Sequence, residues 1–250
     1  MTFISNIRTQ SNMDLDHYQN AFKGIKGSLN LTCSIAEAAL DFNFKNESLD
    51  DDLELNFIFA LAMDAVILGV DLMLNGSRMT GRILKTKRAE DRYEQAISDG
   101  DSPILVEPLP GNHFRLQLGN LTPQEQATVT IRYAQQLIPK SGEYRFVLPT
   151  TIAQRYGATR NATGLPLQPK HDAFVSYPLS LQVKWDPLTM RALSCPSLNH
   201  VMNDICFLGA YDEGFSEDED PSEPAEFGYS GVMNSDYVLT WKLLSPNSLH

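Results

Sequence analysis

Apolar and polar residues alternate along the early part of the chain, in four stretches that follow one another. The regularly spaced apolar residues are Leu29, Leu31 and Cys33, then Leu40, Phe42 and Phe44, then Leu53, Leu55, Phe57 and Phe59, then Val66, Leu68, Val70, Leu72 and Leu74. A period of two is typical of strands that bury one face. A fully buried Leu or Phe contributes about 1.5–3 kcal/mol, so four such strands predict the core of a sandwich.

A tight turn is expected at Asn75 and Gly76, directly after the fourth stretch. Both residue types tolerate positive φ, which a two-residue type I′ turn requires at both of its positions. We therefore predict a hairpin in which residues 66–74 fold back onto residues 78–84.

The period changes to that of a helix over residues 87–98. Ala89, Tyr93, Ala96 and Ile97 fall at i, i+4, i+7 and i+8, which places them on one face, and charged residues fill the other side. Gly100 suits the left-handed position just beyond a helix end. A helix this short is marginal alone, so we expect it to dock through Tyr93, the only large residue on that face.

Alternating strands resume after the helix. They are expected at residues 103–109, 112–118, 126–137, 143–149, 179–185 and 237–243, with a weaker one at 205–208. The fold class predicted is all-β, an antiparallel β-sandwich with one short docked helix at about 87–98. The predicted organisation is a polar tail at 1–20, a main domain at 21–156, a Gly- and Pro-rich linker loop at 157–171, and strands at 172–245 that complete the sandwich.

The net charge of −11 is concentrated in one place. Eight acidic residues lie between Asp212 and Glu226, a stretch without Lys or Arg, so we expect an acidic, solvated loop at 211–226. Nucleic acid binding needs a basic stripe, and anionic membranes attract basic segments, so this charge argues against both as partners.

The three cysteines, Cys33, Cys195 and Cys206, are too few for a disulfide framework. They fit free thiols in the cytoplasm, and a Cys195–Cys206 bridge is the alternative in an oxidising compartment. The chain shows no signal-peptide pattern and no apolar run of membrane-spanning length. Five Asn-x-Ser/Thr triplets occur, at Asn30, Asn46, Asn75, Asn120 and Asn161, and without a secretory signal we read them as coincidental.

Candidate chemistry is sparse. The histidines lack metal-ligand spacing, and neither a nucleophile elbow nor a phosphate-binding loop occurs. The alternative to a non-catalytic protein is a metal- or thiol-dependent enzyme using Cys195, His200 and Cys206. Otherwise we predict no enzyme, no cofactor, and no catalytic, cofactor-binding or metal residues. Glu107 favours an ion pair with Arg115 or Arg132 over catalysis, because no second carboxylate stands at fixed spacing from it.

A family resemblance is carried by four segments. They are Tyr93-Glu94-Gln95-Ala96 before Gly100, Gly119-Asn120-Leu121-Thr122-Pro123, Ile131-Arg132-Tyr133, and Phe146-Val147-Leu148-Pro149-Thr150 leading to Arg155-Tyr156. These resemble the VIT domain, the vault protein inter-alpha-trypsin module, and most nearly that of the intracellular von Willebrand factor A proteins. Where the family commonly has Phe-Pro-Leu-Pro, this chain has Phe59-Ala60-Leu61-Ala62, which puts the turn geometry there in question.

The resemblance implies an all-β module without catalytic activity. Members usually continue into a von Willebrand factor A domain, whose Asp-x-Ser-x-Ser metal site is absent from this sequence. The implied role is a protein–protein interaction or scaffold module. Its expected partner is a protein, with a von Willebrand factor A domain in the same polypeptide as the first candidate.

Overall fold

The computed structural model describes residues 21–151, 177–186, 189–196, 200–201, 225–233 and 235–243. One helix is described, α2 (Thr86–Ser98). The strands are β1 (Phe22–Thr32), β2 (Ile35–Lys45), β3 (Leu53–Ala60), β4 (Ala65–Leu74), β5 (Ser77–Thr80), β6 (Ile104–Leu109), β7 (His113–Leu121), β8 (Gln126–Gln136), β9 (Glu143–Leu148), β10 (Pro178–Trp185), β11 (Met190–Ser194), β12 (His200–Val201), β13 (Ala225–Val232) and β14 (Tyr237–Leu243).

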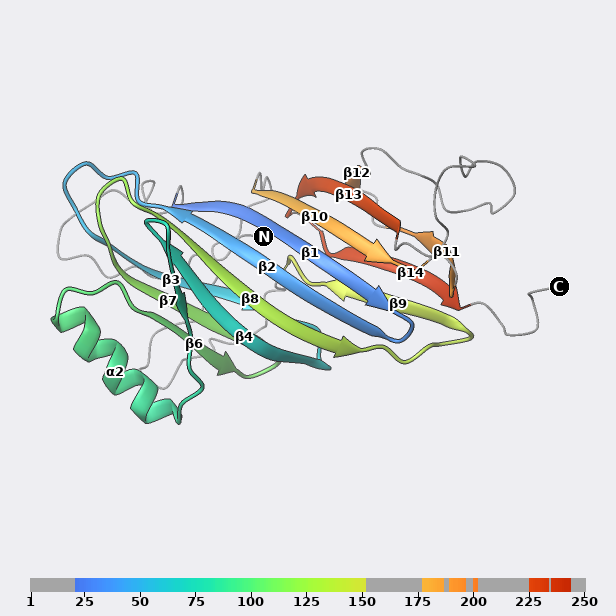
Figure 1. The fold of residues 1–250 in the computed structure, drawn as a ribbon, viewed down its shortest axis with the longest axis horizontal. Coiled ribbons are helices and arrows are strands. Elements are labelled where there is room, and N and C mark those ends of the chain that lie inside the picture. Colours follow the sequence, from blue (N-terminus) through green and yellow to red (C-terminus); the bar gives the residue numbers. More distant parts are fainter. Residues whose placement is uncertain are drawn as a thin grey trace, which may run out of the picture.

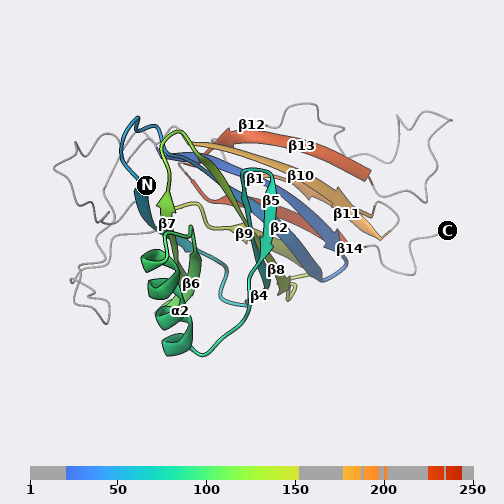
Figure 2. The same cartoon turned by 60° about the vertical axis from the view of Figure 1, so that its left-hand side comes forward.

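The strands form two layers, which confirms the predicted all-β sandwich with one helix (Figures 1 and 2). One layer is an eight-stranded sheet in the order β12-β13-β10-β1-β2-β8-β4-β5. Two three-stranded sheets, β11-β14-β9 and β3-β7-β6, pack on one face of it. Alternating Leu, Ile, Val and Phe residues of both layers meet in one continuous core.

The two small sheets cover opposite ends of the large one. Near the β1–β2 turn, the indole N–H of Trp241 in β14 donates to the carbonyl oxygen of Cys33 at 3.3 Å. At the other end, the ring of Phe57 in β3 lies 4.8 Å from that of Phe22 and 5.7 Å from that of Phe44, between ring centroids. Both small sheets are therefore needed to bury the inner face of the long strands.

One strand pair departs from the predicted antiparallel arrangement. β1 and β10 run parallel, with Ile25 opposite Leu179 and Leu31 opposite Trp185. All the other pairs between the strands that the structure describes are antiparallel. Through this pair the late strands β10, β13 and β12 extend the sheet that the early strands begin.

Three predicted details need correction. Cys33 does not continue the strand of Leu29 and Leu31, because it has φ +50° in the β1–β2 turn. The Asn75-Gly76 turn has the expected positive φ at both residues, but β5 ends at Thr80 instead of residue 84. β12 and β13 were not predicted, and β13 begins at Ala225, inside the stretch assigned to the acidic loop.

The rest of that loop, the strand expected at 205–208, the tail at 1–20 and the linker at 157–171 lie outside the described residues. No helix in the described part of the chain is long and apolar enough to cross a membrane.

Candidate functional site

Helix α2 docks on the β3-β7-β6 sheet, on the side away from the large sheet (Figures 1 and 2). Tyr93 is its one buried residue, with 5% of its surface exposed, as the docking prediction requires. The contact is made possible by Gly119 of β7. A Cβ atom on Gly119 would lie 2.0 Å from Cδ1 of Ile97 and 3.0 Å from the hydroxyl oxygen of Tyr93. A Cβ atom at this position would therefore force the end of the Ile97 side chain to move.

The buried phenol of Tyr93 is not a candidate acid or base. Burial raises the pKa of Tyr93 far above its usual value, and the carboxylates of Glu54 and Glu94 raise it further, because a phenolate would be repelled by both. The hydroxyl therefore stays protonated at any physiological pH. Its role in the described structure is to fill the interface between helix and sheet.

The C-terminal end of α2 is closed by backbone and side-chain hydrogen bonds. The N–H of Gly100, at φ +83°, donates to the carbonyl of Ile97 at 3.1 Å, and the N–H of Asp101 donates to that of Ala96 at 2.9 Å. This pair of bonds is the Schellman arrangement that glycine favours just beyond a helix. The side-chain amide of Asn120 adds bonds to the carbonyls of Ile97 at 3.1 Å and Asp101 at 2.7 Å. The Gly119-Asn120 pair thus receives the helix and caps it.

A second buried asparagine fixes the loop between β2 and β3. Asn46 is 2% exposed, and its amide nitrogen donates to the carbonyls of Asp51 and Leu121, both at 2.8 Å. Next to it, Glu125 accepts hydrogen bonds from the backbone N–H of Thr122 at 2.9 Å and from the side chain of Asn75 at 2.5 Å. These side chains tie three turns together at one end of the sandwich.

The ion pair predicted for Glu107 is present, with Arg115 as its partner. The guanidinium of Arg115 donates to one carboxylate oxygen of Glu107 from Nε at 2.9 Å and from Nη2 at 2.5 Å, and both side chains are largely buried. The other candidate, Arg132, instead lies 3.1 Å from Asp71 of β4. Glu107 is therefore paired with its neighbour on β7.

Asp71 is a buried carboxylate near the edge of the large sheet. Arg78 of β5 donates to it at 2.7 Å, and this hydrogen bond holds the pKa of Asp71 below its usual value. Burial acts in the opposite direction, and the positive charges of Arg132 and Arg78 add to the lowering. Asp71 thus anchors two arginines on the outer face of β4 and β8.

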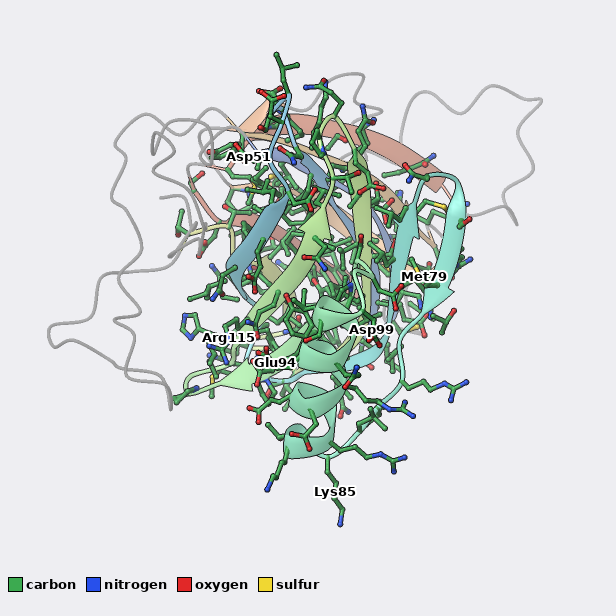
Figure 3. The ribbon with its side chains drawn as sticks, turned by 90° about the vertical axis from the view of Figure 1, so that its left-hand side faces the viewer. Asp51, Met79, Lys85, Glu94, Asp99 and Arg115 are labelled. Atoms are coloured by element: carbon green, nitrogen blue, oxygen red, sulfur yellow. The ribbon has the colours of Figure 1, made fainter. Side chains whose placement is uncertain are left out.

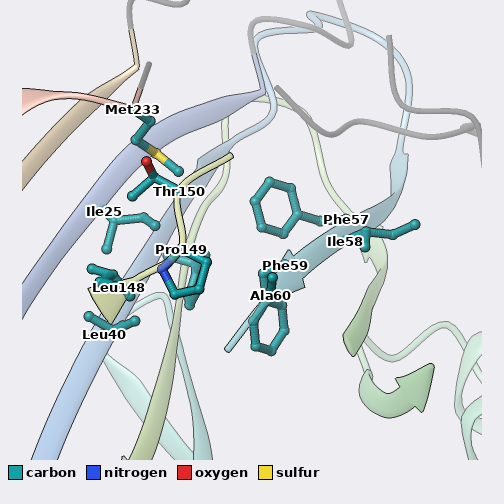
Figure 4. Close-up of a pocket in the computed structure, with 11 residues that line it drawn as sticks. Ile25, Leu40, Phe57, Ile58, Phe59, Ala60, Leu148, Pro149, Thr150 and Met233 are labelled. Atoms are coloured by element: carbon teal, nitrogen blue, oxygen red, sulfur yellow. The ribbon is translucent and has the colours of Figure 1, made fainter. Parts of the chain in front are cut away.

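A small apolar cleft lies between the two small sheets (Figure 4). Phe57, Phe59, Leu148 and Pro149 form its sides, with Leu40 of the large sheet among the lining residues. Its volume of about 20 Å³ is on the scale of a single water molecule. Nearby, the amide of Asn112 bonds to the carbonyls of Leu61 and Ala62, which secures the turn where the family's prolines are missing.

The structure describes two of the three residues of the alternative enzyme hypothesis, and they belong to different sheets. Cys195 follows β11 in a three-stranded sheet, His200 begins β12 in the eight-stranded sheet, and Cys206 lies outside the described residues. Within the described ranges, no group of three or more His, Cys, Asp or Glu side chains could hold a metal ion. The absence of catalytic, cofactor-binding and metal residues from this chain stays a prediction.

Asn46, Asn120 and Glu125 were not recognised from the sequence as structural centres. Each follows or precedes the end of a strand, and Asn120 has φ +48°, a conformation that asparagine tolerates better than most residues. An asparagine at a strand end was the available signal, but it did not reveal the distant carbonyls to which the amides bind.

Helix α2, Gly119 and Asn120 all lie within a segment that matches a family model. Residues 23–133 match the model of the vault protein inter-alpha-trypsin domain. This match confirms the resemblance to the VIT domain inferred from the sequence.

Similar proteins include von Willebrand factor A domain-containing proteins and a mono-ADP-ribosyltransferase. The chain is 31% identical over 137 residues to human von Willebrand factor A domain-containing protein 5A, covering 54% of this chain and 17% of that protein. It is 29% identical over 101 residues to mouse protein mono-ADP-ribosyltransferase PARP4, covering 40% of this chain and 5% of that protein. A von Willebrand factor A domain-containing protein of Dictyostelium discoideum is 29% identical over 116 residues, covering 44% of this chain and 12% of its own length. The chain thus spans less than a fifth of these relatives.

Among solved structures, leukotriene A4 hydrolase of Saccharomyces cerevisiae aligns with 94% of this chain and 32% of its own, at 11% identity and a TM-score of 0.40. A similarity this weak supports no conclusion on fold or activity.

Proposed function

We propose that this chain is a non-catalytic protein–protein interaction module that works beside a von Willebrand factor A domain, in the same polypeptide or in a partner. The observation that carries the proposal is the use of its buried polar side chains. Asn46, Asn120, Glu125 and Glu107 each bind a turn, a helix end or a neighbouring strand. Groups committed in this way hold a shape and do not converge on a substrate.

The names of the relatives support the proposed partner. Several proteins that share this segment are von Willebrand factor A domain-containing proteins by name. A cytoplasmic location fits the sparse cysteines, of which Cys33 and Cys195 are free. We also propose that residues 21–156 and 172–245 form one folding unit, since the core continues from β1–β9 into β10 and β14.

The pairing is tested by mixing the purified chain with the von Willebrand factor A domain of the human relative. Size-exclusion chromatography and titration calorimetry should show a saturable complex, while a fibronectin type III domain used as a β-sandwich control should give none. Absence of a complex at high micromolar concentration, for a correctly folded chain, would contradict the proposed pairing.

The non-catalytic part is tested by metal analysis of the intact protein. We expect no stoichiometric zinc. Bound zinc that is lost in Cys195→Ser but retained in Cys33→Ser would contradict the proposal and favour the site at Cys195, His200 and Cys206. Cys33 is a matched control because it is a free cysteine in the β1–β2 turn.

A further inference from the structure

A concentrated basic surface interrupts this acidic protein beside helix α2. Between Arg78 and Arg92 the chain carries six of its twenty Lys and Arg residues and two acidic ones, although the net charge of the whole is −11. We define the basic surface as Arg78 of β5, Arg82 and Lys85 of the connection to α2, and Arg88 and Arg92 of the helix. All but Arg92 lie in the continuous segment from Arg78 to Arg88, and all five side chains are exposed.

Two of the three cations of helix α2 lie on one flank. At about 100° per residue, Arg88 and Arg92 lie on one side of the buried Tyr93, while Lys87, Glu90, Asp91 and Glu94 lie on the other. In Figure 3, Glu94 is on the side of Arg115 and Asp99 is on the side of Met79. Since Asp99 follows the same flank as Arg88 and Arg92, the basic flank faces the β4–β5 hairpin, and Lys85 points outwards at its lower end.

Apolar side chains are exposed within the same surface. Ile83 is 96% exposed, and Met79 of β5 and Leu68 of β4 are about half exposed. The N–H of Gly81 donates to the carbonyl of Val70 at 2.7 Å, so the segment that carries Arg82 and Ile83 leaves the sheet beside β4. Large apolar residues gathered among charges are typical of a surface that binds a protein.

An open strand edge adjoins these side chains. β5 pairs only with Asp71–Leu74 of β4, and β4 is bonded to β8 along its other side. In the part of the chain that the structure describes, residues 65–69 of β4 have no strand partner on the side away from β8. Unpaired backbone groups on an edge can bind an extended peptide as an added strand.

Most cations of the basic surface are not held in ion pairs among the described residues. Arg78 pairs with Asp71, but among the described residues Arg82, Lys85, Arg88 and Arg92 have no ion pair. The first turn of α2 also has no acidic residue and no side-chain cap. Positive charge at this end opposes the helix dipole and destabilises the helix locally. A local rule broken without a gain in folding is expected where a surface has another use.

We propose that the basic surface docks an acidic, extended segment of a partner protein that also carries an apolar residue. This inference deepens the proposed interaction role and rests on it. The cations match the acidic side chains of the segment, Ile83 and Met79 take its apolar residue, and the β4 edge binds its backbone. The net charge of −11 repels extended polyanions such as an anionic membrane or nucleic acid, whereas a short acidic segment meets only the local positive field.

The experiment measures binding of a fluorescein-labelled dodecapeptide in which glutamates flank a Leu-Leu pair, by fluorescence anisotropy with the full chain. The wild type should bind the peptide and not its glutamine counterpart, with affinity falling as salt rises. The variant Arg82→Glu/Lys85→Glu/Arg88→Glu should bind about ten-fold more weakly or worse, because attraction becomes repulsion. Ile83→Ser should weaken binding by about three- to ten-fold.

A matched control reverses three exposed cations elsewhere, in Lys26→Glu/Lys140→Glu/Arg145→Glu. It carries the same change of net charge and should bind like the wild type. Equal loss in both triple variants, or no loss in the first, would overturn the docking surface. Thermal unfolding of each variant verifies that it is folded.

Two other occupants are decided by the same proteins. In one outcome, phosphatidylserine vesicles or duplex DNA bind the wild type but not the first triple variant, and the peptide binds neither protein. That outcome would overturn the acidic-segment proposal. If the chain binds the von Willebrand factor A domain but not the peptide, the docking-surface proposal is wrong and the proposed pairing stands. Peptide binding without any von Willebrand factor A complex removes the proposed pairing alone.

Discussion

The two ends of helix α2 are built in opposite ways. At its C-terminal end, backbone bonds from Gly100 and Asp101 and amide bonds from Asn120 satisfy the last carbonyls, and Gly119 receives the side chains of the last turns. At its N-terminal end, Lys85 is an uncapped start and Lys87 and Arg88 oppose the dipole. Each such cation costs about 0.3–1 kcal/mol. The comparison teaches that one end of the helix serves the fold, and the other is free to meet a partner.

The largest test of the C-terminal anchorage is Tyr93→Ala. Deleting a buried ring leaves a cavity between helix and sheet, so the free energy of unfolding should fall by about 3–5 kcal/mol. Chemical denaturation monitored by circular dichroism measures the change. A loss below about 1 kcal/mol would mean that the sheet does not hold the helix through this residue.

Gly119→Ala should have the next largest effect. The added Cβ would collide with Cδ1 of Ile97 at 2.0 Å, and relieving such overpacking typically costs about 1–3 kcal/mol. The double variant Gly119→Ala/Ile97→Ala removes the colliding atoms and should recover part of this loss. Additive destabilisation in the double variant would show that the two residues are not in contact.

Two substitutions of Asn120 distinguish the effect of its backbone conformation from the effect of its capping hydrogen bonds. Asn120→Gly keeps a residue that accepts φ +48° but removes the two amide bonds, and should cost about 1–2 kcal/mol. Asn120→Ala removes the bonds and adds the strain of left-handed backbone, and should cost about 1–2 kcal/mol more. Equal stability of the two variants in denaturant would show that the conformation at this position carries no strain.

At the other end, Lys85→Asp should stabilise the protein. Lys85 already has the extended backbone of a residue that precedes a helix, and a carboxylate there can accept a first-turn N–H. The expected gain is about 1 kcal/mol in unfolding free energy, and the acidic dodecapeptide should bind more weakly. A loss of stability would show that the N-terminal end is already optimised for folding.

The smallest effect concerns Asp71, which holds the one paired cation of the basic surface. Its pKa is lower in the folded protein than in the unfolded chain, so its contribution to stability is present above the unfolded pKa, about 3.9, and is lost as pH falls through the folded value. The melting temperature of Asp71→Asn should therefore be lower near neutral pH and approach that of the wild type below pH ~3. The exposed Asp64→Asn serves as a control and should follow the wild type.

Elements with a strong local period could be predicted from the sequence. β8, β14 and α2 agree with prediction to within a residue or two, because alternation or helical spacing is sustained over most of their length. The Asn75-Gly76 turn was equally readable, since its backbone requirement is local. Tyr93 was identified as the docking residue for the same reason: it is the only large side chain on its face.

Features that depend on distant residues could not be predicted. The sequence of β13 contains Gly228 and Gly231 next to an acidic run, so its alternation is broken, and its pairing with β10 makes it a strand. The parallel pairing of β1 with β10 joins segments far apart in the sequence. The meeting of Gly119 with Ile97 arises only when helix and sheet are assembled, although both residues lay in segments singled out beforehand.

The hydrogen bonds of Asn46, Asn75 and Asn120 bear on whether this domain could fold after glycosylation. Each is the acceptor asparagine of a glycosylation triplet, and each uses the amide nitrogen to which a sugar would be joined. The amides of Asn46 and Asn120 both donate twice, so an attached oligosaccharide would remove a donor and would have to fit where backbone already packs. A chain that acquired glycans at these sites before folding would therefore lose the clamps that hold its turns and its helix.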